Sequence, residues 1–124
     1  MGLTHVTARL ANPARPRKTI RVRFLVDSGA VYSVVPATVL GRLRIQAHSS
    51  RTFMLADGTE ITRRVGDATF QFGAHRGASP VIFGEEGDSA LFGAVSLESL
   101  GLVLDPMKRV LRELPMVLGQ HLAI

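Results

Sequence analysis

Short runs of strand-forming residues, separated by turn-forming residues, dominate this sequence. The clearest run is TIRVRFLV at residues 19–26, where apolar and basic residues alternate before the run becomes wholly apolar. Alternation with a period of two is typical of a strand that buries one face, and β-branched and aromatic residues favour strands. We therefore predict a strand here that begins half-exposed and ends buried.

Similar runs recur at short spacing along the chain, with glycine and proline between them. We expect strands at 3–10, 19–26 and 31–35, a hairpin and a second strand pair within 51–77 (the pair running through 65–73), strands on both sides of a glycine loop within 79–95, and two more near 102–106 and 109–114. Residues 11–18, which hold two prolines, are expected to form a connecting turn. Short helices are expected at 36–43 and 97–100, the second capped by Ser96 and closed by Gly101.

This pattern predicts an all-β fold, a small barrel or sandwich with one or two short helices. The 124 residues are enough for a single domain with one core, and we expect residues 1–124 to form it, with an apolar tail at about 115–124. The chain has no cysteine, which excludes disulfides and thiolate metal sites. No apolar run is long enough to span a membrane and no signal-peptide core begins the chain, so a cytoplasmic location is expected.

The chain is basic, with a net charge of +5, and 13 of its 15 basic residues are arginine. Arginines at 15, 17, 21 and 23 and Lys18 form the densest cluster. Neither the aromatic pattern of an RNA-binding sheet nor a helix-turn-helix pattern accompanies this charge, so the sequence favours a half-exposed strand over a nucleic-acid-binding surface. We expect no metal or cofactor, because the four histidines lack ligand spacing and the acidic loop at 85–88 lacks a calcium-binding pattern.

The most unusual acid is Asp27, in the stretch FLVDSGAVYSVVP at residues 24–36. Polar residues usually flank an acid in a surface turn, whereas apolar residues surround this one. A partly buried carboxylate needs a partner or has a function. The alternative is a turn acid that accepts a hydrogen bond from a neighbouring backbone N–H.

Three features together resemble the retroviral-type aspartic peptidases and their bacterial relatives. LVDSGA at residues 25–30 looks like the catalytic motif of that family, Leu91-Phe92-Gly93 looks like its later hydrophobic-hydrophobic-glycine element, and the Asp57-Gly58 hairpin is placed like its flap. Asp57-Gly58 itself predicts a type I′ turn with positive φ. The resemblance covers roughly residues 3–114 and implies a small, closed, barrel-like acid protease fold.

The resemblance implies an aspartic endopeptidase in which two carboxylates activate one water molecule. Because the chain carries a single motif of this kind, it implies a homodimer in which Asp27 of each subunit meets on the two-fold axis and a peptide or protein is the substrate. The implied catalytic residues are Asp27, Ser28 and Gly29. The implied substrate-binding residues are Ala30, Val31, Leu55, Ala56, Asp57, Gly58 and Phe92. The apolar tail is expected either to join the dimer interface or to pack on its own subunit.

The chain also departs from the pattern of the retroviral enzymes. Ser28 replaces the usual threonine, Val31 stands where those enzymes carry an acid, and Ala94 stands where they carry the arginine that pairs with it. Loss of both partners is coherent, because either charge alone would be unpaired. Two alternatives therefore stay open: a domain of this fold that binds peptides or a protein without cleaving them, and a basic domain associated with nucleic acid.

Overall fold

The computed structural model describes residues 3–116, 118 and 119, which form nine strands and two short helices. In chain order the elements are β1 (His5–Asn12), β2 (Arg15–Val26), β3 (Ser33–Pro36), α1 (Ala37–Arg42), β4 (Ser49–Met54), β5 (Glu60–Phe72), β6 (His75–Gly84), β7 (Leu91–Phe92), α2 (Ala94–Ser99), β8 (Leu102–Asp105) and β9 (Val110–Glu113). The expected all-β class with short helices is confirmed.

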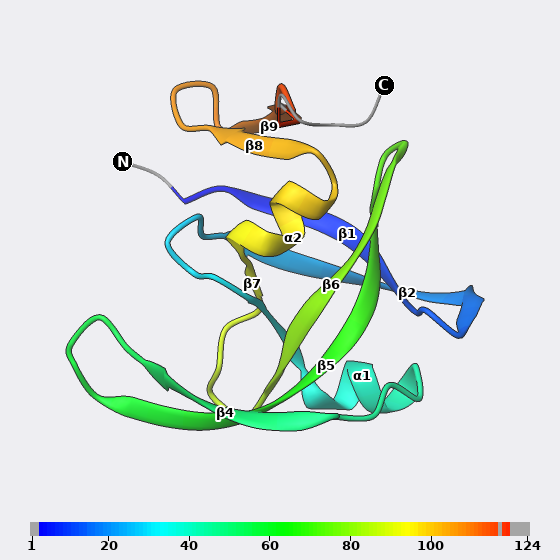
Figure 1. Cartoon of the computed structure of the whole chain (residues 1–124), viewed down its shortest axis with the longest axis vertical. Coiled ribbons are helices and arrows are strands. Elements are labelled where there is room, and N and C mark those ends of the chain that lie inside the picture. Colours follow the sequence, from blue (N-terminus) through cyan, green and yellow to red (C-terminus); the bar gives the residue numbers. More distant parts are fainter. Residues whose placement is uncertain (1–2, 117, 120–124) are drawn as a thin grey trace.

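Seven of these strands form one sheet in the order β1-β2-β7-β3-β6-β5-β4. A further pairing of β1 with β5, through Arg9–Gln71, Leu10–Phe70 and Ala11–Thr69, closes the sheet on itself. The result is a small barrel, which confirms the barrel-like architecture (Figure 1). β4 extends the sheet beyond the closure, and β8 and β9 form a separate two-stranded sheet.

Aromatic side chains fill the centre of the barrel. Phe24 of β2, Phe70 of β5 and Phe92 of β7 are fully buried, with ring centroids 5.3–5.9 Å apart. Burying one such side chain stabilises a protein by about 1.5–3 kcal/mol. Because these rings come from strands that are distant in the sequence, their packing holds the three strands together.

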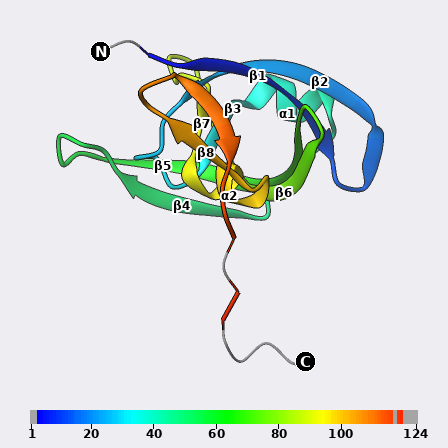
Figure 2. The ribbon, with the colours of Figure 1, turned by 90° about the horizontal axis from the view of Figure 1, so that it is seen from above.

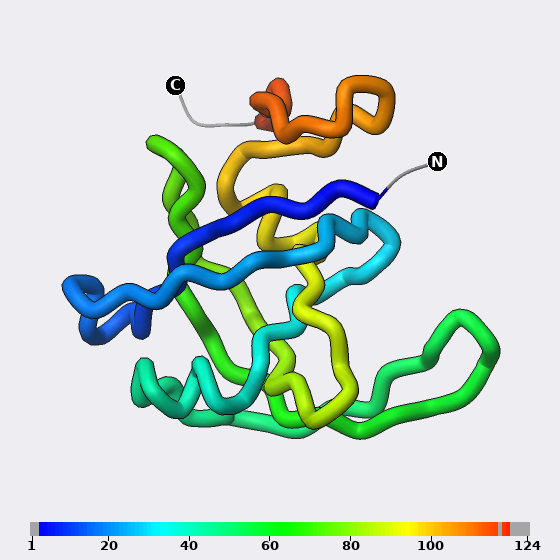
Figure 3. Tube along the Cα trace, turned by 180° about the vertical axis from the view of Figure 1, so that it is seen from behind, coloured from blue at the N-terminus to red at the C-terminus, as the bar shows by residue number. Residues whose placement is uncertain are grey.

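Two hairpins project from opposite ends of the barrel. Figures 2 and 3 show the turn between β4 and β5 at one end and the turn between β1 and β2 at the other. β1 and β2 run side by side along one flank of the molecule, between the chain start and this second turn (Figure 3). The two projections therefore offer separate surfaces to other molecules.

Several predicted boundaries were wrong. The turn predicted at 11–18 is only residues 13 and 14, because residues 16–18 form a bulge without partners on β1, where a proline costs no ladder hydrogen bond. The strand pair predicted within 65–73 is instead the second half of one long strand, β5, which pairs successively with β4, β6 and β1. Ser96 is not a helix cap: α2 begins after Gly93, and Ser96 is buried inside it.

Among the described residues, no helix has the length and apolar character needed to cross a bilayer. The predicted apolar tail falls partly on positions 117 and 120–124, which lie outside the described residues. Leu114 still contacts the body, because its N–H donates to the carbonyl of Gly101 at 2.7 Å.

Candidate active site

Asp27 begins the loop that follows β2, and backbone contacts hold it in place. Its N–H donates to the carbonyl of Phe92 at 3.0 Å, and its Oδ1 accepts the N–H of Gly29 at 3.0 Å. Ala30 then donates to the Asp27 carbonyl at 3.1 Å, which closes a tight turn. The side chain is half-buried, so one carboxylate oxygen is oriented by the loop while the group remains accessible.

β7 forms the floor beneath this loop, because it lies between β2 and β3 in the sheet. Val26 is opposite Phe92 in the parallel pairing with β2, and Val34 is opposite Leu91 in the antiparallel pairing with β3. Gly93 follows directly, and a Cβ there would lie 2.6 Å from the carbonyl carbon of Tyr32. Only glycine therefore lets the two loops approach this closely.

The first turn of α2 fixes the other side of the Asp27 loop. The N–H groups of Ala94 and Val95 donate to the carbonyls of Ala30 and Val31 at 2.8 and 3.0 Å. These are N-terminal helix groups that have no partner inside the helix. The loop carrying Asp27 is thus hydrogen-bonded on one side to β7 and on the other to α2.

A buried chain of three serine hydroxyls connects these elements. Ser33 Oγ accepts the N–H of Gly93 at 2.9 Å and lies 2.6 Å from Ser96 Oγ, which lies 2.7 Å from Ser79 Oγ. Ser79 in turn reaches the carbonyl of Pro80 at 3.4 Å. Every hydroxyl proton finds an acceptor only if the chain is directed from Ser33 through Ser96 to Ser79.

A groove of about 440 Å³ starts at Gly29, two residues after Asp27, and runs to the β4–β5 hairpin. Its lining is mainly apolar and comes from the Asp27 loop and β3 on one side, from β4 and β5 on the other, and from β6 and β7. The lining residues are Gly29, Ala30, Val31, Tyr32, Val34, Thr52, Phe53, Met54, Leu55, Ile61, Arg63, Ile82, Asp88, Ser89 and Leu91. A groove of this size and lining suits an apolar side chain.

An ion pair forms one wall of this groove. Arg63 of β5 donates from Nε and Nη2 to the two carboxylate oxygens of Asp88 at 2.9 and 3.1 Å. The side chains are only 16% and 23% exposed. The hydrogen bonds from Arg63 hold the pKa of Asp88 below its ordinary value, although burial acts in the opposite direction. Asp88 is therefore paired and partly buried, whereas Glu85 and Glu86 of the same acidic loop are exposed.

Another part of the lining is organised around Tyr32. Arg51 of β4 donates to the Tyr32 hydroxyl at 2.9 Å, with its guanidinium 5.7 Å from the centre of the ring. Phe53 meets the same ring edge-on, at 6.1 Å between centroids. These contacts join the base of the hairpin to the loop that carries Asp27.

The hairpin is present where Asp57-Gly58 predicted it, but the turn type was wrong. Gly58 has φ +87°, whereas Asp57 is not among the residues with positive φ. The loop is longer than a two-residue turn, because the Leu55 N–H donates to the Thr59 carbonyl at 2.7 Å. Asp57 instead accepts the Thr59 hydroxyl and N–H at 2.7 and 2.9 Å, and these hydrogen bonds lower its pKa.

The structure separates the residues named from the sequence into three groups. Gly29, Ala30, Val31 and Leu55 line the groove, beside Asp27. Ala56, Asp57 and Gly58 lie at the exposed hairpin tip, outside the groove lining. Phe92 is fully buried in the core, so its side chain is not available to a substrate. Its place as a substrate-binding residue was inferred from the motif, whereas strand alternation turns the ring inward.

Sequence reasoning missed most of the groove. Tyr32, Val34, Ile61, Arg63 and Ile82 belong to it, yet each looks like an ordinary strand residue in the sequence. Only the pairing of β3 with β6 and of β5 with β6 brings these strands to the same wall. Their apolar surroundings could have marked Val34 and Ile82 as at least partly buried, but nothing local marks them as neighbours.

A second, separate surface lies on the other side of Ser28. One hollow of about 350 Å³ is lined by exposed Ser28 together with apolar residues of α2 and β8, among them Leu97, Leu102 and Leu104. An adjoining hollow of about 360 Å³ includes Leu3, Val26 and Met107. Leu3 and Met107 are 71% and 90% exposed, which is unusual for apolar side chains.

Within residues 3–116, 118 and 119, no group of three His, Cys, Asp or Glu side chains could hold a metal ion. The chemistry that the described site offers is that of a carboxylate, backbone amides and an apolar groove.

Comparison with known proteins gives one family. Residues 7–95, well over half of the chain, match the family described as "Aspartyl protease", and the match includes Asp27 and Gly93. No curated protein matches the chain. The solution structure of the simian foamy virus (mac) protease is 16% identical with a TM-score of 0.49, covering 75% of this chain and 92% of that one. On the strength of the family match, the chain belongs to the aspartyl protease family.

Proposed function

We propose that this protein is an aspartic endopeptidase that works as a homodimer, with Asp27 of each subunit as the catalytic pair. The single observation that carries the proposal is the position of Asp27. Its loop is held by hydrogen bonds to Phe92 and Gly29, its carboxylate is accessible, and an apolar groove begins two residues further on. The family match to residues 7–95 supports the same chemistry.

The proposed reaction needs two carboxylates at about 3 Å, which cannot both ionise and so share one proton. The ionised carboxylate accepts a proton from water as the water oxygen attacks the peptide carbonyl carbon. The protonated carboxylate donates to the carbonyl oxygen, which becomes the hydroxyl of a tetrahedral intermediate. Transfer of a proton to the amide nitrogen then lets the C–N bond break.

The second carboxylate must come from another chain. The described residues contain one Asp-Ser-Gly loop, and no other Asp or Glu side chain lines the groove except Asp88, which Arg63 already binds. The apolar surface around Ser28, with exposed Leu3 and Met107, is the surface that a second copy would cover. A two-fold axis through this surface would bring the Ser28 loops, and with them the Asp27 side chains, together.

The groove supports a preference for apolar side chains in the substrate. Val34, Ile61, Ile82 and Leu91 line it, and Tyr32 closes one wall.

We also propose that residues 1–124 form one domain; a cytoplasmic location stays a prediction. The β4–β5 hairpin, whose residue Leu55 reaches the groove, is proposed to cover a bound peptide.

The decisive variant is Asp27→Asn, with Asp67→Asn as the matched control. Asparagine can still accept the N–H of Gly29, so the fold should be retained, while cleavage of an apolar peptide library should disappear. Asp67 is exposed on β5 and pairs with His48 at 3.3 Å, so its replacement should leave cleavage unchanged. Cleavage by the Asp27→Asn protein would overturn the assignment of the catalytic residue.

Mixing the two proteins tests the dimer itself. If subunits exchange freely and both Asp27 side chains are required, an equal mixture of wild type and Asp27→Asn retains about one quarter of the activity of the same total wild type. If each chain acts alone, it retains about half.

The second candidate is a domain of this fold that binds peptides without cleaving them. Val31 and Ala94 stand where the retroviral enzymes carry an ion pair, and this difference is the observation that favours the second candidate. It would be supported by a wild type that binds the peptide library and never cleaves it between acidic and neutral pH.

A further inference from the structure

β1 and β2 carry an unusual row of arginines on their outer face. Successive side chains of a strand point to opposite faces, and along β2 the even positions Val22, Phe24 and Val26 are buried. Arg21 and Arg23 therefore lie on the outer face, and Arg15 and Arg17 are exposed nearer the hairpin end of β2, beside and within the bulge at residues 16–18. Arg9 of β1 lies directly opposite Arg21 in the register. We call these five residues the arginine face.

No acidic partner balances the arginine face. β1, β2 and the neighbouring β7 contain no Asp or Glu, and Asp67 of β5, which also pairs with β1, contacts His48. None of the ion pairs formed by the described residues involves an arginine of this face. Like charges directly opposite each other on a sheet destabilise the pair. The juxtaposition of Arg9 and Arg21 is thus a cost in the free protein that a bound anion would offset.

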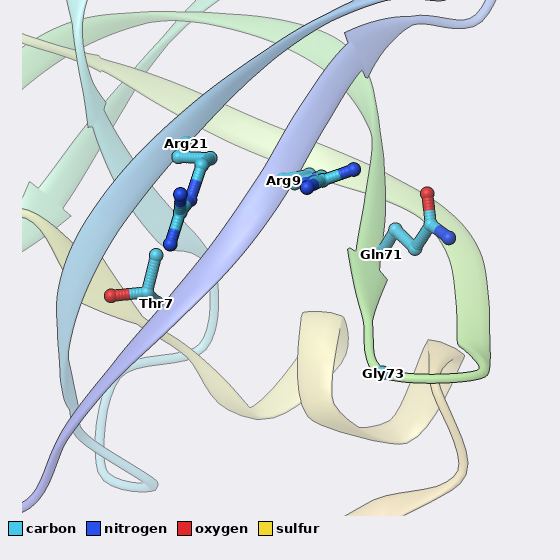
Figure 4. A pocket seen from close by; sticks show the side chains of 5 residues that line it. All are labelled: Thr7, Arg9, Arg21, Gln71 and Gly73. Atoms are coloured by element: carbon cyan, nitrogen blue, oxygen red, sulfur yellow. The ribbon is translucent and has the colours of Figure 1, made fainter.

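A hollow of about 370 Å³ lies at this juxtaposition, lined by Thr7, Arg9, Arg21, Gln71 and Gly73. Figure 4 shows the Arg21 side chain extending toward Thr7, and the Arg9 side chain extending toward Gln71. Two guanidinium groups, a hydroxyl and an amide are all hydrogen-bond donors. Planar guanidinium forks match the oxygens of a phosphate group, so the hollow offers the donor set for one.

We propose that the arginine face binds the phosphate backbone of a nucleic acid without reading its base sequence. A protein partner would need an apolar anchor in a pocket, and the lining of this hollow provides none. Contacts to a phosphate backbone need only regularly placed positive charges. The sequence alone did not predict this partner, because it lacks base-stacking aromatics; those are needed for base contacts and not for backbone contacts.

This face is separate from the proposed catalytic site. The arginines of β2 precede the loop that carries Asp27, and none of them is among the groove-lining residues. The binding test therefore uses the Asp27→Asn protein, so that failure of the proposed catalysis and failure of this proposal are distinguishable.

The probe is a fluorescently labelled single-stranded 20-mer, in a poly-dT and a mixed-sequence version, followed by anisotropy between 50 and 200 mM salt. Each phosphate contact contributes about 0.7 to the slope of log K against log salt. The double variant Arg21→Gln/Arg23→Gln should lower the slope by about 1.4 and weaken binding at 50 mM salt by at least about tenfold. The two probes should bind equally well within about threefold, because backbone contacts do not read bases.

The matched control, Arg64→Gln/Lys108→Gln, removes the same charge from β5 and the β8–β9 turn and should change affinity by less than about threefold. Thermal unfolding shows that each variant folds, and Arg21→Lys/Arg23→Lys, which keeps the charge, should retain most of the binding. Absence of binding at 50 mM salt, or equal losses in both double variants, would overturn the proposal. Equally tight binding of polyglutamate would overturn it too, in favour of an acidic polypeptide.

Discussion

Replacing Ser96 by alanine should destabilise this protein far more than a surface serine substitution does. Ser96 is fully buried, and its hydroxyl accepts a hydrogen bond from Ser33 and donates one to Ser79. Removing it leaves one buried donor and one buried acceptor without this partner, at about 1–3 kcal/mol each. Ser33 still accepts a hydrogen bond from the N–H of Gly93, and Ser79 keeps its weak contact to the carbonyl of Pro80. We therefore expect Ser96→Ala to lower the free energy of unfolding by about 2–4 kcal/mol in total.

The matched control lies in the same helix. Ser99 donates to the Ser96 carbonyl at 2.8 Å and is only part-buried, so Ser99→Ala should cost about 0.5–1.5 kcal/mol. Replacing serine by alanine stabilises a helix by about 0.5 kcal/mol. This gain is the same in both variants, so it cancels when they are compared.

Thermal unfolding at one fixed protein concentration measures the difference. For a chain of this length, 1 kcal/mol corresponds to about 3–5 °C in Tm, so Ser96→Ala should lower Tm by roughly 5–15 °C and Ser99→Ala by a few degrees at most. Equal shifts in the two variants would refute the role of the buried hydroxyl chain. The proposed cleavage activity should fall with Ser96→Ala as well, because Ser33 belongs to the segment that follows the Asp27 loop.

Three further predictions follow from single contacts. Gly93→Ala places a Cβ 2.6 Å from a backbone carbon and should lower the free energy of chemical unfolding by at least about 1–3 kcal/mol. Gly41→Ala in α1, where no atom lies within 4 Å of the added Cβ, should raise it by up to about 1 kcal/mol. Equal effects of the two substitutions would contradict the steric reasoning. Because Arg63 lowers the pKa of Asp88, this pair stabilises the fold above pH 4, and the Tm advantage of wild type over Asp88→Asn should decline as pH falls below 4; an advantage that stays constant as the pH falls would exclude the ion pair as its source. Arg9→Thr removes a like-charge pair across the β1–β2 strands and should raise stability by about 0.2–1 kcal/mol at low salt, with a smaller gain at high salt; a loss of stability would show that the pair is not repulsive.

Much of the fold could be predicted from local sequence. Alternation in residues 19–26 and the glycine-rich loops around Asp27 and Gly93 are local signals, and the structure places strands and loops there. The helix predicted at 36–43 is present as α1, although Pro36 is the last residue of β3 and directly precedes the helix instead of starting it. These predictions succeed because side-chain direction and turn geometry depend on a few neighbouring residues.

The misses have a different origin. β5 continues unbroken from Glu60 to Phe72 because it pairs with three strands, and no local pattern reveals those partners. Ser96 looked like a helix cap, since serine favours that position, but its hydroxyl is used by side chains 63 and 17 residues away. Nothing local marks Asp88 as a paired acid, because its partner Arg63 lies 25 residues away in the sequence.

Local sequence is enough to predict the strand-rich class, the position of the Asp27 loop and the family, because each depends on a short run of residues. Four features emerge only when the whole chain has folded: the barrel closure between β1 and β5, the lining of the groove, the burial of Phe92 and the juxtaposition of Arg9 and Arg21. These depend on strand register, and the register is chosen by the packing of the whole core. A shift of one residue would turn the arginine face inward and Phe24 outward, and the cost of that exchange selects the observed arrangement.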